Sequence, residues 1–268
     1  MKGRYFWALV LVVVGVWILL SNLGILPGFS WGIFVPILLI LAGLAMILSR
    51  TGRAVEFQQV TDSLSLDGAT TARITFKHGA GRLRVGAGAP VGQVLAGTFA
   101  GGVEKETARR GESIDVTLHT PAQEWSSWVV PWNWSGRGGG FEWDVRLSAE
   151  PGLALKFETG AGESRLDFSG LRVSEVTLKT GASSTQMVLP AAAGFTRVEI
   201  SSGAAEVNVA VPAGVGAHVS GSMGLGALNV DQSRFPRREG FYESADYAAS
   251  ANRVEVRVDG GVGAVNVR

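Results

Sequence analysis

The side chains able to serve as metal ligands, acids or nucleophiles are few and scattered along this chain. The 268 residues include no cysteine and three histidines, His78, His119 and His218. Without cysteine, disulfides, thiolate catalysis and cysteine zinc sites are all excluded. The histidines are isolated from one another and none stands in a metal-ligand spacing such as H-E-x-x-H, so each is expected to be a strand residue. The sequence therefore predicts no metal site and no cofactor.

Two further patterns resemble catalytic motifs only superficially. The glycine-rich stretch from Gly79 to Arg84 lacks the Lys-Ser/Thr pair and the following helix of a phosphate-binding loop. Glu163, Asp167 and Glu206 fall at or near the ends of repeated segments and would form an acidic row in a regular stack, where a solvated face explains them better than a glycosidase pair. No G-x-S-x-G elbow occurs. We therefore expect a protein that is not an enzyme.

A cluster of tryptophans is the most suggestive candidate for a binding site. Trp125, Trp128, Trp132 and Trp134 stand within ten residues, next to the glycine-rich run 136–140. Tryptophan offers a large contact area and a polar N–H, so these four predict a surface for a partner protein or for the membrane interface. The alternative is that they cap an open end of a repetitive fold, which such folds require.

The charge distribution argues against nucleic acid as a partner. Only 18% of the residues are charged, and the formal net charge is +1. Lys2, Arg4 and Arg50 lie in an N-terminal stretch without acidic residues, which leaves the remainder roughly neutral to slightly acidic. Phosphate binding needs a clustered basic surface, and this chain has none in its sequence.

One pattern recurs through residues 66–268, and it predicts an all-β domain. Apolar residues stand three and five positions before a glycine in five copies, and six positions after it in all six copies. This period of two is typical of strands with one buried face. The six copies are Ile74–Val85, Leu155–Leu166, Val176–Met187, Val198–Val209, Val219–Val230 and Val256–Val267.

The central glycines are predicted to be structural corners at which each strand bends. They are Gly79, Gly160, Gly181, Gly203, Gly224 and Gly261. Glycine accepts positive φ and lets neighbouring backbones approach closely. Four of these glycines are 21 or 22 residues apart, which is typical of a β-solenoid whose turns bury their apolar faces against one another. An ordinary β-sandwich with glycine-rich hairpins is the alternative.

The N-terminus predicts a helical hairpin that crosses a membrane twice, over residues 5–26 and 31–48 of a segment 1–50. As helices these stretches are about 33 Å and about 27 Å long, against a hydrocarbon core of about 30 Å. A turn signal, 27–30, separates them. A cleaved signal peptide is the rival interpretation, but the first stretch is too long and no small-x-small cleavage site follows it.

The basic residues beside these stretches predict the orientation. Lys2 and Arg4 precede the first stretch, Arg50 and Arg53 follow the second, and the connecting loop carries no charge. By the positive-inside rule both ends of the hairpin face the cytoplasm. We therefore expect a multi-pass protein of the plasma membrane, with a linker at 51–65 and a cytoplasmic β-domain at 66–268 that is interrupted by insertions at about 121–143 and 233–252.

The order of these segments resembles a known family. Residues 22–26, Trp31 and residues 36–43 resemble the transmembrane region of LiaI/LiaF-type bacterial envelope-stress proteins. The Gly-Ala-Gly repeats and the ending from Tyr242 to Val267 resemble the toastrack β-domain of LiaF, LiaG and related candidate adhesins. LiaF-type proteins are membrane-bound negative regulators of a sensor kinase that responds to cell-wall damage. This chain departs from them in having two predicted spans where they tend to have more, and in its tryptophan-rich insertion.

The resemblance implies a regulatory or scaffolding role with no catalytic residues. We expect a membrane-anchored accessory protein of a cell-envelope stress response that binds a membrane protein such as a sensor kinase. A self-assembling β-solenoid scaffold comparable to bactofilins, and an extracellular adhesin of opposite topology, are the alternatives.

Overall fold

The computed structural model describes residues 59–121 and 141–268, and within them it contains β-strands and no helix. The strands are β1 Gln59–Ser65, β2 Thr71–Ala87, β3 Gln93–Ala100, β4 Glu104–Arg110, β5 Ser113–His119, β6 Glu142–Leu147, β7 Gly152–Asp167, β8 Val173–Val188, β9 Phe195–Ala210, β10 Gly216–Val230, β11 Tyr242–Glu243 and β12 Arg253–Val267. Accordingly, no helix in this part of the chain is long and apolar enough to cross a bilayer. The predicted spans 5–26 and 31–48 and the four clustered tryptophans lie outside the described residues.

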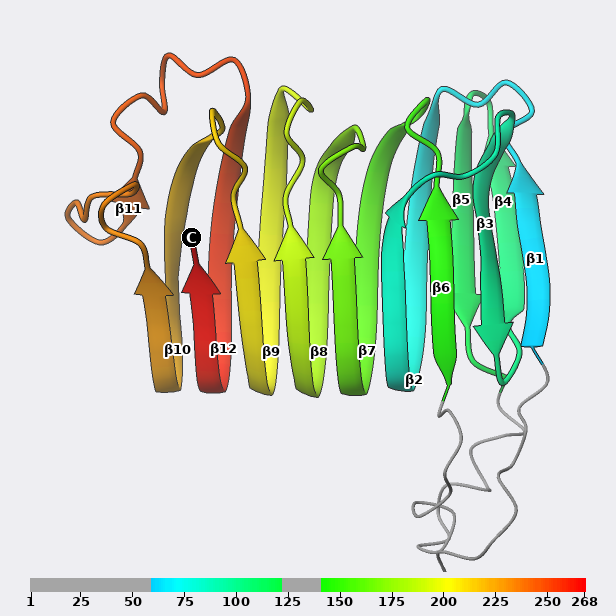
Figure 1. Cartoon of the computed structure of the whole chain (residues 1–268), viewed down its shortest axis with the longest axis horizontal. Coiled ribbons are helices and arrows are strands. Elements are labelled where there is room, and N and C mark those ends of the chain that lie inside the picture. Colours follow the sequence, from blue (N-terminus) through cyan, green and yellow to red (C-terminus); the bar gives the residue numbers. More distant parts are fainter. Residues whose placement is uncertain (1–58, 122–140) are drawn as a thin grey trace, which may run out of the picture. The chain divides into compact units, whose positions relative to one another are not determined.

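Six long strands, β2, β7, β8, β9, β10 and β12, each bend near the middle, so their two halves lie in two facing layers (Figure 1). Neighbours run parallel and in register, so that Phe76, Phe157 and Leu178 occupy the same level in successive strands. Their side chains point between the layers, where the rings of Phe76 and Phe157 stack with centroids 4.9 Å apart. The alternation of apolar residues thus builds one core between two layers, as expected of a solenoid-like fold.

The order of the strands differs from the order of the repeats in sequence. Along the stack the order is β2-β7-β8-β9-β12-β10, so the last strand of the chain lies between β9 and β10. A stack that followed the chain order would place the copy around Gly224 directly on the copy around Gly203, but β12 lies between them. Residues 231–252 carry the chain from the end of β10 back to the start of β12, which makes the exchange possible.

Strands β5 and β6 together form a split turn of the stack. β5 pairs parallel with the first half of β2, from Thr71 to Lys77, and β6 pairs parallel with the second half, from Arg82 to Ala87. The segment 122–140 therefore enters and leaves the domain where the other turns have their glycine corner. β1 begins at the same edge of the domain, because Gln59 pairs with Ala100 of β3 and the adjacent Phe99 pairs with Trp143 at the start of β6.

The corner glycines lie at the bends, but one of the two physical reasons predicted for them is wrong. None of the six has a positive φ; the positive values occur two residues later, at Gly81, Gly162 and Gly263. What the six glycines permit is close stacking of backbones. A Cβ at Gly160 would overlap the carbonyl oxygen of Gly79, and one at Gly181 would lie 2.7 Å from the carbonyl oxygen of Gly160.

Residues 231–252, which we call the C-terminal cap, cover part of β10. Phe235 is buried in the core, and Arg234 donates hydrogen bonds to the carbonyl oxygens of Val211 and Pro212 at 2.8 and 3.1 Å. The short strand β11 pairs with His218 and Val219 of β10. The second insertion predicted from the sequence thus closes the first half of the last strand in the stack.

Candidate functional site

A groove of about 970 Å³ crosses the stack beside the bent edge, and we call it the corner groove. It passes over β5, β2, β7, β8, β9 and β12. Six strands at the usual spacing span roughly 24 Å, the length of about seven residues of extended chain. In each bent strand that it crosses, the lining consists of the corner glycine and the two residues before it. These glycines are Gly79, Gly160, Gly181, Gly203 and Gly261.

The groove exists because one level of the stack has no side chains. Four of the glycines at this level face a neighbouring glycine carbonyl that leaves little or no room for a Cβ; at Gly203 the nearest oxygen would be 3.1 Å away. Because glycine has no side chain, the close stacking of these backbones produces both the tight bend and the corner groove along it. At the far end the side chain of Met223 in β10 lies over Gly260 and limits the groove.

One wall of the groove is a row of polar residues that lie opposite one another on successive strands. In order across the stack they are His119, Lys77, Glu158, Lys179, Ser201 and Asp259. Lys77, Lys179 and Asp259 have no ion-pair partner among the residues that the structure describes. Their charges are therefore available to a bound molecule.

Glu158 is already neutralised within the protein. Lys156 forms a hydrogen-bonded ion pair with it at 2.7 Å, and this hydrogen bond is the main reason why the pKa of Glu158 lies below its usual value. The positive charges of Lys156, Lys77 and Lys179 lower that pKa further. The wall is consequently basic between β2 and β8 and acidic at β12. An extended segment with an acidic side chain near Lys77 or Lys179 and a basic one near Asp259 would complement it.

The two histidines of the groove differ in environment. His119 is half-buried, with its ring nitrogens 3.5 Å from Glu104 and 3.7 Å from Glu106. His78 is buried against the indole of Trp143, with ring centroids 5.0 Å apart, and burial lowers its pKa to about 4 despite a backbone hydrogen bond with Phe141. His78 is thus a neutral core residue, and no group of three or more possible metal ligands occurs within residues 59–121 and 141–268.

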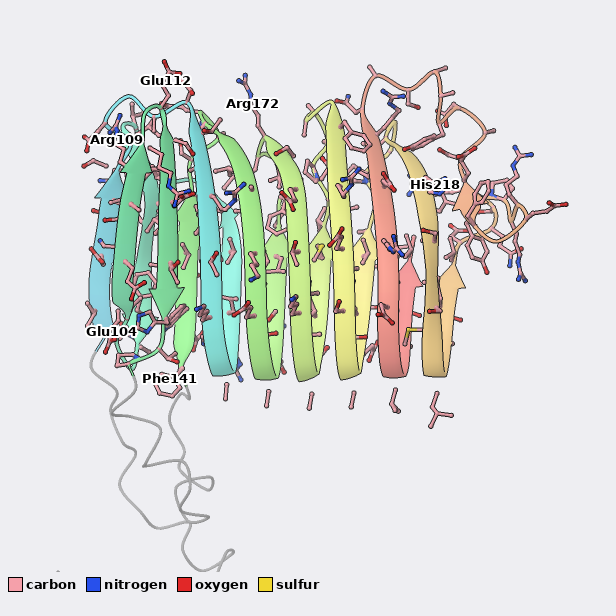
Figure 2. All side chains as sticks on the ribbon, turned by 180° about the vertical axis from the view of Figure 1, so that it is seen from behind. Glu104, Arg109, Glu112, Phe141, Arg172 and His218 are labelled. Carbon is pink, nitrogen blue, oxygen red and sulfur yellow. The ribbon has the colours of Figure 1, made fainter. Side chains whose placement is uncertain are left out.

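Next to the groove, the tips of the corners form an uncharged ridge. Figure 2 shows a row of side chains that point away from the bent edge. Across the stack the ridge consists of Ala80, Ala161, Ala182, Ala204, Val262 and Leu225. Leu225 and Val262 are 81% and 50% exposed, so apolar area lies beside the polar wall.

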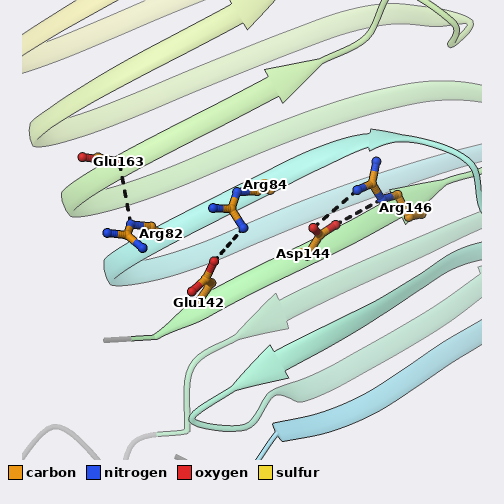
Figure 3. A network of polar contacts seen from close by, with 6 residues as sticks. All are labelled: Arg82, Arg84, Glu142, Asp144, Arg146 and Glu163. Atoms are coloured by element: carbon orange, nitrogen blue, oxygen red, sulfur yellow. Dashed lines mark hydrogen bonds and ion pairs between the residues drawn. The ribbon is translucent and has the colours of Figure 1, made fainter. Parts of the chain in front are cut away.

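The structure separates the acidic residues that a regular stack would have grouped. Glu163 and Glu206 share a level, but Ser184 of β8 stands between them and Glu163 lies 3.7 Å from Arg82. Asp167 lies at the other end of β7, where it accepts hydrogen bonds from Ser169. These carboxylates belong to the outer face, as do the pairs of Arg84 with Glu142 at 2.6 Å and Arg146 with Asp144 at 3.1 Å (Figure 3).

Trp143, at the end of the predicted insertion 121–143, is a core residue. Trp143 lies in β6, is fully buried, and packs edge-to-face on Phe99 with centroids 5.3 Å apart. The groove itself was missed by sequence reasoning, because its wall joins residues as far apart as Lys77 and Glu158. The signal that could have revealed it was the position two residues before each corner glycine, which is charged in four of the six copies.

A family model for the N-terminal domain of toast_rack, DUF2154, matches residues 53–210. The chain belongs to the toast-rack family. A model for the LiaF transmembrane domain matches residues 6–63, so this toast-rack protein is a membrane-associated, LiaF-like protein, as the resemblance implied. The second model describes a transmembrane domain, and neither description names a reaction.

The toast-rack domain also resembles solved structures. A candidate cell adhesion protein from Clostridium sporogenes ATCC 15579 superposes with a TM-score of 0.68 at 20% identity, covering 79% of this chain and 98% of that one, which supports the fold alone. A candidate adhesin from Bacteroides fragilis NCTC 9343 gives a TM-score of 0.28 at 7% identity, covering 81% of this chain and 100% of that one, and carries no argument. Among curated proteins, none matches the sequence.

Proposed function

We propose that this toast-rack protein is a membrane-anchored, non-enzymatic accessory protein of a bacterial cell-envelope stress response, and that it acts by binding a membrane protein such as a sensor kinase. The observation that carries the proposal is the corner groove. It is polar, contains charges without an ion-pair partner among the described residues, and is long enough for an extended peptide segment of the partner. The LiaF transmembrane domain supports a membrane protein as the partner.

The position of the groove supports the same partner. The chain enters β1 at Gln59 and leaves for the tryptophan-bearing segment after Pro121, and both points lie at the bent edge where the groove runs. Trp125, Trp128, Trp132 and Trp134 are proposed, as from the sequence, to contribute to partner binding as well. Tethering raises the local concentration of that partner, so that modest contacts suffice.

Recovery of partners from native membranes tests the proposal. Lys179→Glu reverses one charge of the groove wall, and Arg172→Glu is the matched control, because Arg172 is exposed at the opposite edge of the domain (Figure 2). We expect Lys179→Glu and the quadruple tryptophan-to-alanine variant to lose a partner that wild type and Arg172→Glu both recover. Equal recovery by all four proteins would refute binding through the groove and the tryptophans.

We further propose that both termini face the cytoplasm, because the basic residues flank the hairpin on its outer ends. A reporter that is active only in the cytoplasm should be active when fused after Arg268. A reporter that is active only outside the membrane should be inactive at the same position. The reverse result would favour an extracellular adhesin. The similarity to the candidate cell adhesion protein, at 20% identity, supports a shared fold and gives no evidence for adhesion.

A further inference from the structure

The two ends of the stack are protected very differently against pairing with other strands. At one end the edge strands are β1 and β4, and at the other end the edge strand is β10. Exposed edges present unpaired N–H and C=O groups, and soluble proteins usually guard them with charges, proline, bulges or a covering segment. The distribution of these protective features indicates which edge is protected against pairing with another strand and which edge is open to it.

The end formed by β1 and β4 is guarded. Five of the seven residues of β4, from Glu104 to Arg110, are charged. Lys105 reaches across to β1, where its ammonium donates a hydrogen bond to the carbonyl oxygen of Ser63 at 3.0 Å and pairs with Asp62 at 2.6 Å. A second strand arriving here would have to displace these contacts and accommodate the charges.

The β10 end is open along half of its length. The C-terminal cap pairs with His218 and Val219 only, and the stretch from Ser220 to Val230 pairs with β12 and with no other described strand. β10 contains no Asp, Glu, Lys, Arg or Pro. Leu228 and Val230 are only partly buried, whereas Val265 and Val267, their partners in β12, are fully or almost fully buried.

A ladder of asparagine side chains ends at the same edge. Asn266 donates to the side-chain oxygen of Asn208 at 2.9 Å, and Asn229 of β10 donates to that of Asn266 at 2.9 Å. The side-chain oxygen of Asn229 accepts no hydrogen bond from the residues that the structure describes. The ladder therefore stops with an acceptor that a further strand could occupy.

We propose that the open half of β10, Ser220–Val230, pairs with the same strand of a second copy to form a closed two-fold dimer. The same edge of two copies can meet in one sheet only when the strands are antiparallel, and such a contact is self-complementary and closes on itself. An uncharged strand meets its own copy without repulsion. The charges on β4 oppose the alternative, a head-to-tail filament, in which β10 would meet the other end.

The position of the C-terminus removes an objection to pairing at this end. A charged C-terminal residue, Arg268, could guard an edge formed by the last strand of the chain. Because β12 lies between β9 and β10, Arg268 lies away from this edge, and its backbone forms hydrogen bonds with Val209 and Val211. The membrane tether raises the local concentration of a second copy, so a short edge contact suffices.

Disulfide cross-linking of the full-length protein in native membranes tests the dimer, and the chain has no cysteine of its own. Single cysteines at Leu225, Ala227 and Asn229 sample the open edge, and a cysteine at Glu106 samples the guarded end. We expect cross-linked dimers from at least one β10 position and none from Glu106. Monomers only from all three β10 positions would overturn the two-fold dimer.

A matched pair of charge insertions separates edge pairing from misfolding. Ala227→Lys places a lysine on the open edge, and Ala108→Lys makes the same change on β4; both alanines are exposed. We expect Ala227→Lys to reduce the cross-linked fraction of a β10 cysteine at least fivefold while the melting temperature stays at the wild-type value, and Ala108→Lys to change neither. Cross-linking of Ala227→Lys at the wild-type level would refute the proposal.

Discussion

At the scale of single residues, the corner glycines differ in how much room their neighbours leave. A Cβ would overlap a carbonyl oxygen at Gly160, lie 2.7 Å from one at Gly181, and lie 3.3 Å from one at Gly224 in the edge strand. We expect Gly160→Ala and Gly181→Ala to lower the free energy of unfolding by about 1–3 kcal/mol, as overpacking usually does. Urea midpoints at constant slope measure the change.

Gly224→Ala is the internal control for this series. Its Cβ would make a contact that a shift of a few tenths of an ångström relieves, and the lost freedom of the unfolded chain partly offsets the cost. We expect a change below about 1 kcal/mol. If the three variants are equally stable, the requirement for glycine does not come from the stacked backbones.

His78 gives the domain a pH-dependent stability. Its folded-state pKa of about 4 lies below the ordinary value of 6.5, so protons bind preferentially to the unfolded chain as the pH falls. The stabilisation is complete above pH 6.5 and is lost between 6.5 and about 4, by about 3 kcal/mol at most. Urea midpoints measured from pH 7 to pH 4 should show this decline.

The contribution of His78 is isolated by replacement. His78→Leu keeps an apolar side chain against Trp143 and cannot titrate, so its stability should fall less steeply across this pH range. His119→Gln changes the other histidine of the groove and should not alter the part of the pH-dependent loss of stability that His78 causes. A His78→Leu variant with the same pH dependence as wild type would show that other groups cause the decline.

At the scale of elements, the split turn shows how the tryptophan-bearing segment joins the domain. β5 and β6 are each held by β2, and the pair of Arg84 with Glu142 fixes the start of β6. In β2 the same bend takes two residues, Gly79 and Ala80, between the levels of Thr120 and Phe141. We expect a variant with Gly-Ala in place of 121–140 to fold with a melting temperature within a few degrees of wild type.

The same variant decides what the four tryptophans do. If they bind a partner, it should stay folded and recover less partner from membranes. If they serve as a structural cap, its melting temperature should fall by 10 °C or more, on the order of 3–5 kcal/mol for a domain of this size. Circular dichroism melting and the membrane pull-down distinguish the two outcomes.

Elements of this fold differ in how far the sequence alone predicts them. Apolar alternation and glycine spacing predict the bent strands and their register, because both depend on neighbours within one repeat. The exchange of β10 and β12 is not predictable in this way: the copies around Gly224 and Gly261 share Gly-x-Gly-Ala and Asn-Val, so either fits beside β9. The cap that routes the chain decides the order. The groove likewise depends on contacts between repeats.

At the scale of the whole molecule, family and fold describe a β-domain joined to a LiaF transmembrane domain. The two ends of the β-domain are unlike, with charges on β4 and none on β10. This asymmetry favours a closed assembly over the self-assembling scaffold considered from the sequence, because a filament must join unlike ends.

The membrane segment should be needed for function only as a tether. Removing residues 1–50 leaves the described β-strands intact, so the shortened protein should fold, but it loses the high local concentration near a membrane partner. We expect it to restore poorly the basal output of the envelope-stress response in a strain that lacks the gene, even at wild-type protein levels. An unrelated two-span anchor of the same orientation, fused to residue 51, should restore that output because it restores the tether. Failure of this fusion, at equal abundance in the membrane, would show that the LiaF segment itself contacts the partner, and full activity of the untethered domain would remove the tether from the mechanism.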